Sequence, residues 1–282
     1  MADQPIRILS TRPLEAALLE QAAGNGVLID TLPFILTELV VEPALHDQLL
    51  ELSRRPLVAV FTSMNAVEAL ALHLGLTVGG EAANIRPAAV DRLTGINTRP
   101  AAGWQIYCMG YATQQLVRRH FGENSIVGTA ASATALAAVI VGQQAIGQPV
   151  PGRADALVGQ PPDAQNNAPR ELFFFCGDQR RDELPEKLRQ QGIRVNEWVV
   201  YRTKRTPHKV EAVYDGVIFF SPSAVHSFFT ANALPAGTLL FAIGETTAGT
   251  IRSYTSNRIL LSGSPEKEAL IRQVIDHYNI KL

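Results

Sequence analysis

The sequence predicts an α/β fold with two similar parallel-sheet domains. Short apolar runs alternate with segments of helical period, a pattern typical of parallel strands that helices cover on both faces. The length of 282 residues is above the usual size of a single domain. The alternating units also fall into two series that resemble each other in order. This order predicts two domains of similar architecture.

Each unit consists of an apolar run, a turn of small or hydroxyl-bearing residues, and a helical segment. In residues 6–20, IRIL predicts a strand, STR predicts a turn, and LEAALLE predicts the start of a helix. The same order recurs at residues 57–72 (VAVF, then TS), 104–119 (QIYCM, then G), 171–188 (LFFFC, then GD), 215–229 (VIFF, then SPS) and 239–251 (LLFAI, then GET), and more weakly at residues 125–141 and 258–275.

The units of the two series match one another in order. Ser63 in FTSMNAVEAL corresponds to Ser221 in FFSPSAVHSF, and MGYATQQL corresponds to IGETTAGTI. The next pair is GTAASATALAAVI and LSGSPEKEALIRQVI. The fourth unit of the first series ends in GIRVNEWVVYRT, and its partner is GVLIDTLPFILT near the N-terminus. The second series is therefore circularly closed, which predicts that one domain contains both ends of the chain.

The domain boundaries follow from this closure. We predict that domain 1 combines residues 1–36 with residues 204–282, and that domain 2 spans residues 40–198. The chain then crosses between the domains at residues 33–41 and 195–205. Both crossing segments have strand composition, so we expect them to pair as a two-stranded β-ladder hinge. A single large sheet is the alternative.

Two stretches interrupt the pattern. Residues 76–99 contain Gly and Pro, lack a clear period, and widen the spacing between units of the first series. Residues 142–170 are rich in Gly, Pro, Gln and Ala and cannot bury much apolar surface. Both stretches are predicted to be insertions, and the second is either a ligand lid or a passive loop.

Charge and composition argue against several classes of function. Twenty-five Lys and Arg residues against 26 Asp and Glu residues leave a net charge of −1, which disfavours nucleic-acid and polybasic membrane binding. No apolar run approaches the roughly 18 residues of a membrane span, and no signal peptide is visible. Two cysteines in apolar runs exclude a disulfide scaffold and indicate the cytoplasm. Six scattered histidines predict no metal site.

Hydroxyl-bearing and small residues follow the predicted strands in both series. In an open parallel sheet, ligands bind at the carboxyl ends of the strands, beside helix N-termini whose N–H groups favour anions. If both domains present such turns to one cleft, its ligand is large and multiply anionic. Each hydroxyl by itself is also typical of a helix N-cap. No GxGxxG follows a strand and GxxxxGK[ST] is absent, which disfavours nucleotide cofactors.

Two further side chains are candidates for chemistry. Arg12 comes directly after the first strand, where it can bind a carboxylate. Tyr201 lies in the second crossing segment, VVYRTKR, where a phenol can donate a proton to a leaving group. The alternative for Tyr201 is a half-buried strand residue that only packs against the hinge.

The ordered set of motifs resembles the uroporphyrinogen-III synthase family. The resemblance rests on VFTSMNAVEAL, CMGYATQQL, FFSPSAVHSFF, FAIGETTAGTI and the segment G-I-x-V-x-x-x-x-V-Y-x-T, and it covers nearly the whole chain outside the two insertions. It implies two α/β domains joined by a two-stranded β-ladder. It also implies that the chain cyclises hydroxymethylbilane to uroporphyrinogen III, with inversion of ring D and loss of water. The family uses no cofactor and no metal.

The resemblance also implies roles for individual residues. Tyr201 corresponds to the family's cleft tyrosine, which is proposed to assist departure of the hydroxyl. Glu245 departs from the pattern, because it places a carboxylate close to an anion site. With Arg12, the predicted substrate-binding residues are Thr62, Ser63, Asn65, Gly110, Thr113, Gly177, Ser221, Ser223, Ala224, Thr246 and Thr247. Among them, Gly110, Gly177, Ser223 and Ala224 lie in turns whose backbone amides are expected to meet the substrate carboxylates.

Two other functions stay open at this point. A non-enzymatic two-domain hinge protein that binds a small polyanion would need the same turns. A two-domain transferase that uses a nucleotide sugar would need a carboxylate pocket for the ribose, which the sequence does not show. The preferred reading is a cytoplasmic, monomeric enzyme whose partner is its small-molecule substrate, with neither nucleic acid nor a membrane involved.

Overall fold

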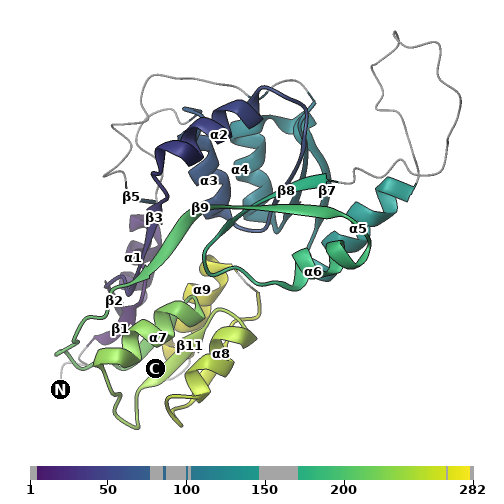
Figure 1. Cartoon of the computed structure of the whole chain (residues 1–282). Helices are drawn as coiled ribbons and strands as arrows, with labels where there is room; N and C mark the ends of the chain where they lie inside the picture. The colour runs from purple at the N-terminus through teal and green to yellow at the C-terminus, as the bar shows by residue number, and fades with distance from the viewer. Residues whose placement is uncertain are drawn as a thin grey trace, which may run out of the picture. The chain divides into compact units, whose positions relative to one another are not determined.

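The computed structural model describes residues 5–76, 85–86, 100, 103–145, 171–264 and 266–279. The chain forms two compact units (Figure 1). Unit 1 consists of Met1–Leu36 and Thr203–Leu282, and unit 2 consists of Thr37–Arg202. Both passages of the chain between the units therefore fall inside the segments that were predicted to cross.

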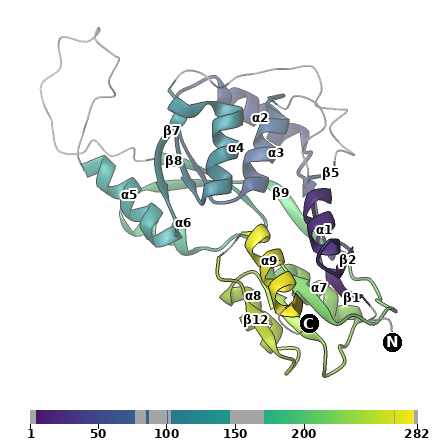
Figure 2. The same cartoon turned by 180° about the vertical axis from the view of Figure 1, so that it is seen from behind.

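Unit 1 contains a parallel sheet with the strand order β12-β11-β10-β1-β2 in the described residues. Figure 2 labels β1, β2 and β12 of this unit from behind. The N-terminal strand β1 pairs with β10 on one side and with β2 on the other, so it completes a sheet whose other half comes from the end of the chain. The elements are β1 (Ile6–Ser10), α1 (Ala16–Ala23), β2 (Val27–Thr31), β10 (Gly216–Phe219), α7 (Pro222–Ala231), β11 (Leu239–Ala242), α8 (Glu245–Arg252), β12 (Ile259–Leu261) and α9 (Lys267–Asn279).

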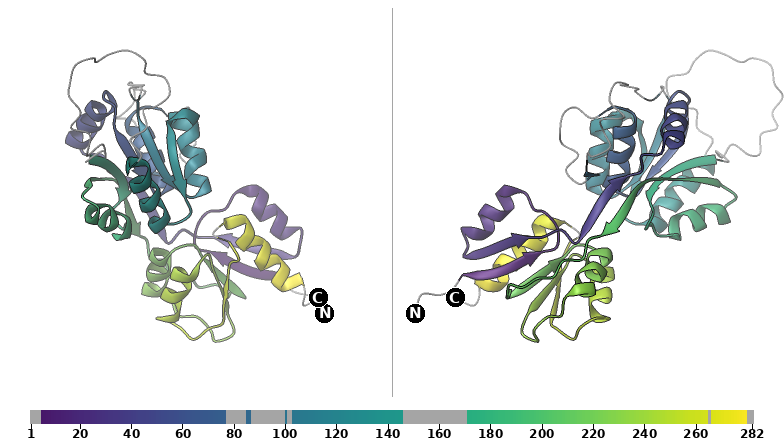
Figure 3. Two further views of the ribbon diagram at one scale, coloured as in Figure 1. Left: turned by 90° about the vertical axis from the view of Figure 1, so that its right-hand side faces the viewer. Right: turned by 60° about the vertical axis from the view of Figure 1, so that its left-hand side comes forward.

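Alternate residues of the unit 1 strands enter two different cores. Leu9 and Val217 pack with the buried side chains of α7 and α8. Ile8 and Ile218 point the other way and pack with α1 and α9. Figure 3 shows α1 in purple and α9 in yellow together on that face of the sheet. Burial on both faces explains why these strands read as continuous apolar runs in the sequence.

Unit 2 contains a sheet with the order β5-β3-β9-β8-β4-β6-β7 in its described residues. β4 lies between β8 and β6 and is parallel to both, and β9 is parallel to β8. The elements are β3 (Ile35–Leu39), α2 (Pro43–Ser53), β4 (Val58–Phe61), α3 (Met64–His73), β5 (Ile85–Arg86), β6 (Gln105–Met109), α4 (Tyr111–Phe121), the 3-10 helix η2 (Glu123–Ser125), β7 (Ile126–Ala130), α5 (Ala133–Ala145), β8 (Glu171–Gly177), α6 (Glu183–Gln190) and β9 (Arg194–Arg205).

The parallel sheets and covering helices confirm the predicted fold class. In unit 2, one core lies under α2, α3 and α4, and Phe61 stacks there on Phe175 with ring centroids 5.4 Å apart. The other core lies under α5 and α6. In the described residues, no helix combines the length and apolar character that a membrane crossing requires.

The segments expected to be irregular are partly regular. α5 continues to Ala145, so the predicted insertion at residues 142–170 begins too early. The Gln143 side chain holds this last turn, because it accepts a hydrogen bond from the Tyr107 hydroxyl at 2.8 Å and donates one to the Val127 carbonyl at 3.0 Å. The remainder of that stretch lies outside the described residues. Within residues 76–99, β5 pairs with β3, and most of the rest is also outside the described residues.

The two segments that were predicted to cross between the units contain neighbouring strands. β3 and β9 are neighbours in the seven-stranded sheet, and the N–H of Val40 donates to the carbonyl of Val200 at 3.1 Å. Within unit 1, the N–H of Thr206 donates to the carbonyl of Phe34 at 3.0 Å. The pair is thus part of a larger sheet, and its action as a hinge stays a prediction.

Candidate functional site

Four predicted site residues form a row across unit 2. Gly177 at the end of β8 is in register with Tyr201 of β9. Phe61 at the end of β4 is in register with both Phe175 of β8 and Cys108 of β6, so extending these pairings by two residues places Ser63 beside Gly177 and Gly110. Tyr201, Gly177, Ser63 and Gly110, which we call the unit 2 row, therefore lie together where β8, β4 and β6 end, beside β9, which continues past Tyr201 to Arg205.

A hydrogen bond joins the two hydroxyl groups of the row. The Oγ atom of Ser63 lies 3.1 Å from the Oη atom of Tyr201, and either oxygen can be the donor. Ser63 is the residue before α3 and has an extended backbone. Burial raises the pKa of the Tyr201 phenol, and the hydrogen bond from Ser63 acts in the opposite direction. The phenol is therefore protonated at neutral pH and can act as a proton donor.

A bulge in β9 directs Tyr201 to this position. The register between β8 and β9 shifts between the pair Cys176–Val199 and the pair Gly177–Tyr201, which leaves one extra residue, Val200, in β9. Strict alternation would place Val200 and Tyr201 on opposite faces of the sheet. Because of the bulge, both side chains contribute to the core under α2, α3 and α4.

Gly177 makes room for the aromatic ring. A Cβ atom at this position would lie 2.4 Å from Cζ and 2.7 Å from Oη of Tyr201. No side chain fits there without displacing the ring. The structure thus gives Gly177 a steric role in addition to the predicted contact between its backbone and a substrate carboxylate.

The other predicted residues of unit 2 surround this row. Gly110 has a φ of +82°, which favours glycine, and a Cβ there would point into open space. Thr62 follows β4 directly and is partly exposed, whereas Thr113 is only 5% exposed inside α4. The amide of Asn65 donates to Thr37 Oγ1 at 3.4 Å. Thr37, a buried polar residue of β3, was not predicted, although it is the only hydroxyl in the run FILTEL.

The helices that begin at this edge offer backbone donors. No side chain in the described residues caps the first turn of α3 or of α4. Their first N–H groups therefore remain available, together with the partial positive charge of each helix N-terminus. This arrangement can bind carboxylates close to Ser63 and Gly110.

Unit 1 has a comparable edge of its own. Phe219 of β10 is in register with Ala242 of β11, so Ser221 and Gly244 lie beside each other two residues later. Ser221 Oγ accepts a hydrogen bond from the N–H of Ala224 at 3.2 Å and so caps α7. The amide of Ala224, which was expected to meet a carboxylate, is therefore already bonded.

The remaining predicted residues of unit 1 lie in the first turns of its helices. Ser223 is partly exposed in α7, Thr246 is exposed in α8, and Thr247 is buried in α8. In the described residues no side chain caps α8, whose first turn follows Gly244. Glu245 pairs with Arg252 of the same helix, and this pairing lowers the pKa of its carboxyl group.

Arg12 also lies at the carboxyl edge of unit 1. Its guanidinium carbon is 5.2 Å from the centroid of the Phe220 ring, and Ser10 Oγ donates to the Arg12 carbonyl at 2.6 Å. Burial lowers the pKa of Arg12, but an arginine remains charged at any physiological pH. A half-buried cation held against a ring binds an anion more strongly than a fully solvated one does.

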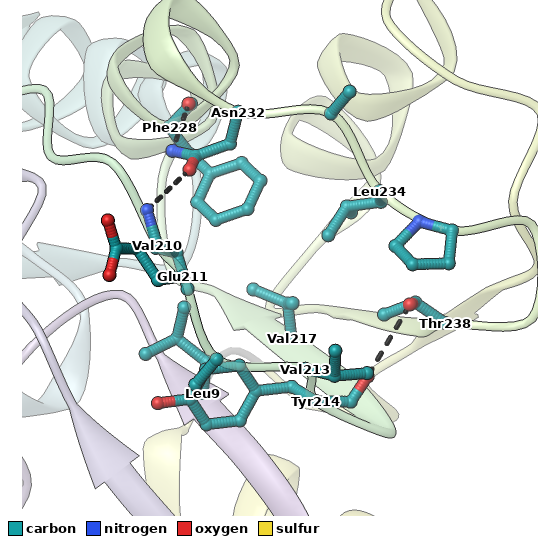
Figure 4. Close-up of a pocket in the computed structure, with 13 residues that line it drawn as sticks. Leu9, Val210, Glu211, Val213, Tyr214, Val217, Phe228, Asn232, Leu234 and Thr238 are labelled. Atoms are coloured by element: carbon teal, nitrogen blue, oxygen red, sulfur yellow. Dashed lines mark hydrogen bonds between the residues drawn. The ribbon is translucent and has the colours of Figure 1, made fainter.

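Neither a metal centre nor the cavity shown in Figure 4 offers an alternative site to these edges. The described residues contain no cluster of three or more His, Cys, Asp or Glu side chains that could hold a metal ion. A cavity of about 180 Å³ lies in unit 1 between residues 210–214 and α7 (Figure 4). The Asn232 side chain in its wall already bonds to Val210 N, Phe228 O and His208 O. None of the predicted site residues lines this cavity.

Comparisons with known proteins agree with one another. The model of a family described as uroporphyrinogen-III synthase HemD matches residues 16–272. The chain is 27% identical over 207 residues to the uroporphyrinogen-III synthase of Saccharomyces cerevisiae, across 67% of this chain and 70% of the yeast protein.

Two solved structures share the fold. A uroporphyrinogen-III synthetase from Helicobacter pylori aligns with a TM-score of 0.57 at 15% identity, across 96% of this chain and 99% of the other. A mutant uroporphyrinogen III synthase from Thermus thermophilus aligns with a TM-score of 0.58 at 15% identity, across 98% of this chain and 100% of the other.

Proposed function

Since the chain belongs to the uroporphyrinogen-III synthase family, we propose that the unit 2 row is its catalytic centre and that Tyr201 is its proton donor. The enzyme acts in tetrapyrrole biosynthesis, where it cyclises hydroxymethylbilane to uroporphyrinogen III. Ring D is inverted and one molecule of water is lost. The observation that supports the proposed centre is the partly buried Tyr201 phenol, whose hydroxyl lies 3.1 Å from that of Ser63 at the carboxyl edge of the sheet.

The first chemical step needs an acid. When the C–O bond of the hydroxymethyl group breaks, the electron pair leaves with oxygen, and the pyrrole nitrogen stabilises the carbon as an azafulvenium. Tyr201 transfers its proton to the departing oxygen, so that water leaves instead of hydroxide. The substrate loses a proton when the macrocycle closes, and that proton restores the phenol. The reaction is a dehydration without net redox change, so we expect no cofactor.

The second task is to control which carbon of ring D attacks. Ring closure without the enzyme gives the uninverted isomer, so the protein has to hold the chain with the substituted carbon of ring D toward the reactive centre. This is catalysis by positioning, and it places few demands on individual side chains. Backbone donors and hydroxyl groups fixed at the ends of strands suit that task.

The eight carboxylates of the substrate match the groups at these edges. We propose that the first turns of α3 and α4, with Thr62, Ser63 and Asn65, bind some of them. Arg12 and the first turn of α8, with Thr246, bind others. The protein has a net charge of only −1, so recognition depends on these local donors and not on long-range attraction.

We also propose that the enzyme works as a monomer in the cytoplasm. Cys108 and Cys176 are both free and buried, which is consistent with a reducing compartment. A non-enzymatic hinge protein that binds a polyanion is not favoured, because the family to which the chain belongs consists of enzymes.

The decisive experiment uses freshly prepared hydroxymethylbilane. Products are oxidised to porphyrins, and isomers I and III are separated by chromatography. We expect isomer III to form well above the level of a reaction without protein. Formation of isomer I alone, at the uncatalysed rate, would contradict the assignment.

A further inference from the structure

Ser63 and Ser221 hold equivalent positions in the two units but use their hydroxyls differently. Each follows a buried strand and precedes a helix, and both have extended backbones. Ser221 Oγ accepts from Ala224 N at 3.2 Å and caps α7. Ser63 makes no such bond to α3, and its hydroxyl lies 3.1 Å from that of Tyr201.

This difference has an energetic consequence. A serine that caps a helix stabilises it by satisfying a backbone N–H of the first turn. Ser63 has the N-cap position and the suitable backbone, but its hydroxyl is directed to the phenol. The interaction with Tyr201 is thus made in place of a local stabilising bond, and the equivalent residue in the other unit shows that the cap is sterically feasible.

Apart from the bond to Ser63, the contacts of Tyr201 in the described part of the chain position its ring and not its hydroxyl proton. Gly177 and the bulge in β9 determine where the ring lies, but rotation about the bond between Cζ and Oη still determines where the proton points. If Ser63 donates to the phenolic oxygen, the proton of Tyr201 is directed away from Ser63. Once the proton has been transferred, the same Ser63 donor stabilises the phenolate oxygen.

We propose that Ser63 is a positioning residue that acts through Tyr201: its hydroxyl orients the phenolic proton and stabilises the phenolate that forms when water leaves. This inference rests on the proposed role of Tyr201. On this proposal, the main function of the Ser63 side chain is to orient Tyr201 and not to bind substrate directly. The proton passes from Tyr201 Oη to the departing oxygen, and Ser63 keeps its own proton throughout.

A double-mutant cycle tests the inference. We expect Ser63→Ala to lower kcat on the order of tenfold, the effect of losing one hydrogen bond to a charged oxygen, with little change in KM. In a Tyr201→Phe background, the same substitution should have no further effect. Ser63→Thr should restore most of the activity, because threonine keeps the hydroxyl and suits an extended backbone.

A titration provides a second readout that a merely structural serine would not affect. The difference in phenolate absorbance between the parent enzyme and Tyr201→Phe reports the pKa of Tyr201. The hydrogen bond from Ser63 lowers the pKa of Tyr201. Ser63→Ala should therefore raise this pKa, and Ser63→Thr should leave it unchanged. Circular dichroism of Ser63→Ala should match the parent, because no helix cap is lost.

Three different results would contradict the proposed role of Ser63. If Ser63→Ala raises KM by the same factor in both backgrounds, Ser63 binds substrate independently and the inference is wrong, although Tyr201 keeps its proposed role. An unchanged phenol titration in Ser63→Ala also overturns the inference. If Tyr201→Phe itself turns over at the parent rate, the proposed function of Tyr201 fails first, and the inference fails with it.

Discussion

The ring of Tyr201 occupies the space that a side chain at position 177 would need. A Cβ atom on Gly177 would lie 2.4 Å from Cζ of the ring, well inside the distance at which two carbon atoms repel. Gly177 ends β8 and Tyr201 lies opposite it in β9. The absence of one side chain thus determines where the Tyr201 phenol of the neighbouring strand is held.

Gly177→Ala should displace the Tyr201 ring. We expect a loss of about 1–3 kcal/mol in the free energy of unfolding, as is usual for an overpacked core. Turnover should fall at least as far as in Tyr201→Phe, because the phenol also moves away from Ser63. Urea denaturation measures the first effect, and the isomer III assay measures the second.

The steric origin of this effect can be checked directly. In a Tyr201→Ala background the ring is absent, so Gly177→Ala should cost little further stability. Gly249→Ala is the matched glycine control: Gly249 lies in α8, and a Cβ there meets nothing within 4 Å. This control should stabilise the protein by about 0.5–1 kcal/mol. If Gly177→Ala lowers the free energy of unfolding equally in the parent and in the Tyr201→Ala background, a clash with the ring is not the cause.

Tyr201→Phe should slow turnover without abolishing it. General acids typically contribute at least about 100-fold to a rate, so we expect kcat to fall by about that factor. The remaining activity reflects positioning, which does not depend on the phenolic proton. Isomer III should therefore still dominate the enzymatic product. Complete loss of activity in a well-folded variant would instead make Tyr201 indispensable, and an unchanged rate would remove it from the mechanism.

Ser221→Ala should reduce stability more than Ser63→Ala does. The hydroxyl of Ser221 caps α7, and loss of such a cap typically costs about 1 kcal/mol. Ser63 caps nothing in the described residues, so its replacement should shift the urea midpoint much less. Equal losses of stability in the two variants would show that the two hydroxyls have the same structural role.

Acid should destabilise unit 2 through His73. This side chain is fully buried, and its Nδ1 lies 3.4 Å from Nδ1 of His46. Burial and the neighbouring His46 lower the pKa of His73 to about 4, from an ordinary value of 6.5. The unfolded chain therefore binds a proton below pH 6.5, and the folded chain does not until about pH 4. The free energy of unfolding should therefore fall as the pH is lowered from 6.5 to about 4, by no more than about 1.4 kcal/mol for each pH unit.

Replacement of His73 isolates this contribution. In His73→Leu, the loss of unfolding free energy between pH 6.5 and pH 4.5 should be smaller than in the parent by about 2 kcal/mol. His208→Gln, which replaces an exposed histidine, provides the comparison variant. If His73→Leu retains the full dependence, other groups are responsible for it.

Much of the fold was predictable because it depends on local composition. Apolar runs followed by turns predicted the strands and helices, since strands buried on both faces leave a continuous apolar signal. The predicted crossings at residues 33–41 and 195–205 contain the two points where the chain passes between the units. The end of α5 was predicted wrongly, because Gly and Gln near its C-terminus resemble a loop although the helix continues to Ala145.

The candidate site was predictable only as a set of residue types. Hydroxyls and glycines after strands indicated an anion-binding edge, but the same residues also serve as helix caps. The sequence motif could not separate Ser221, which caps its helix, from Ser63, which does not. Thr37 was not predicted because one threonine in an apolar strand is common.

By itself, the sequence determined the fold class, the discontinuous order of the units and the turns that carry polar groups, because each depends on short-range pattern and on the order of units. Only the tertiary structure decided which groups meet. Ser63 and Tyr201 are 138 positions apart, and they come together because β4, β8 and β9 are neighbours in the sheet. The bulge in β9 turns the phenol toward the hydroxyl, and the missing side chain of Gly177 leaves room for the ring.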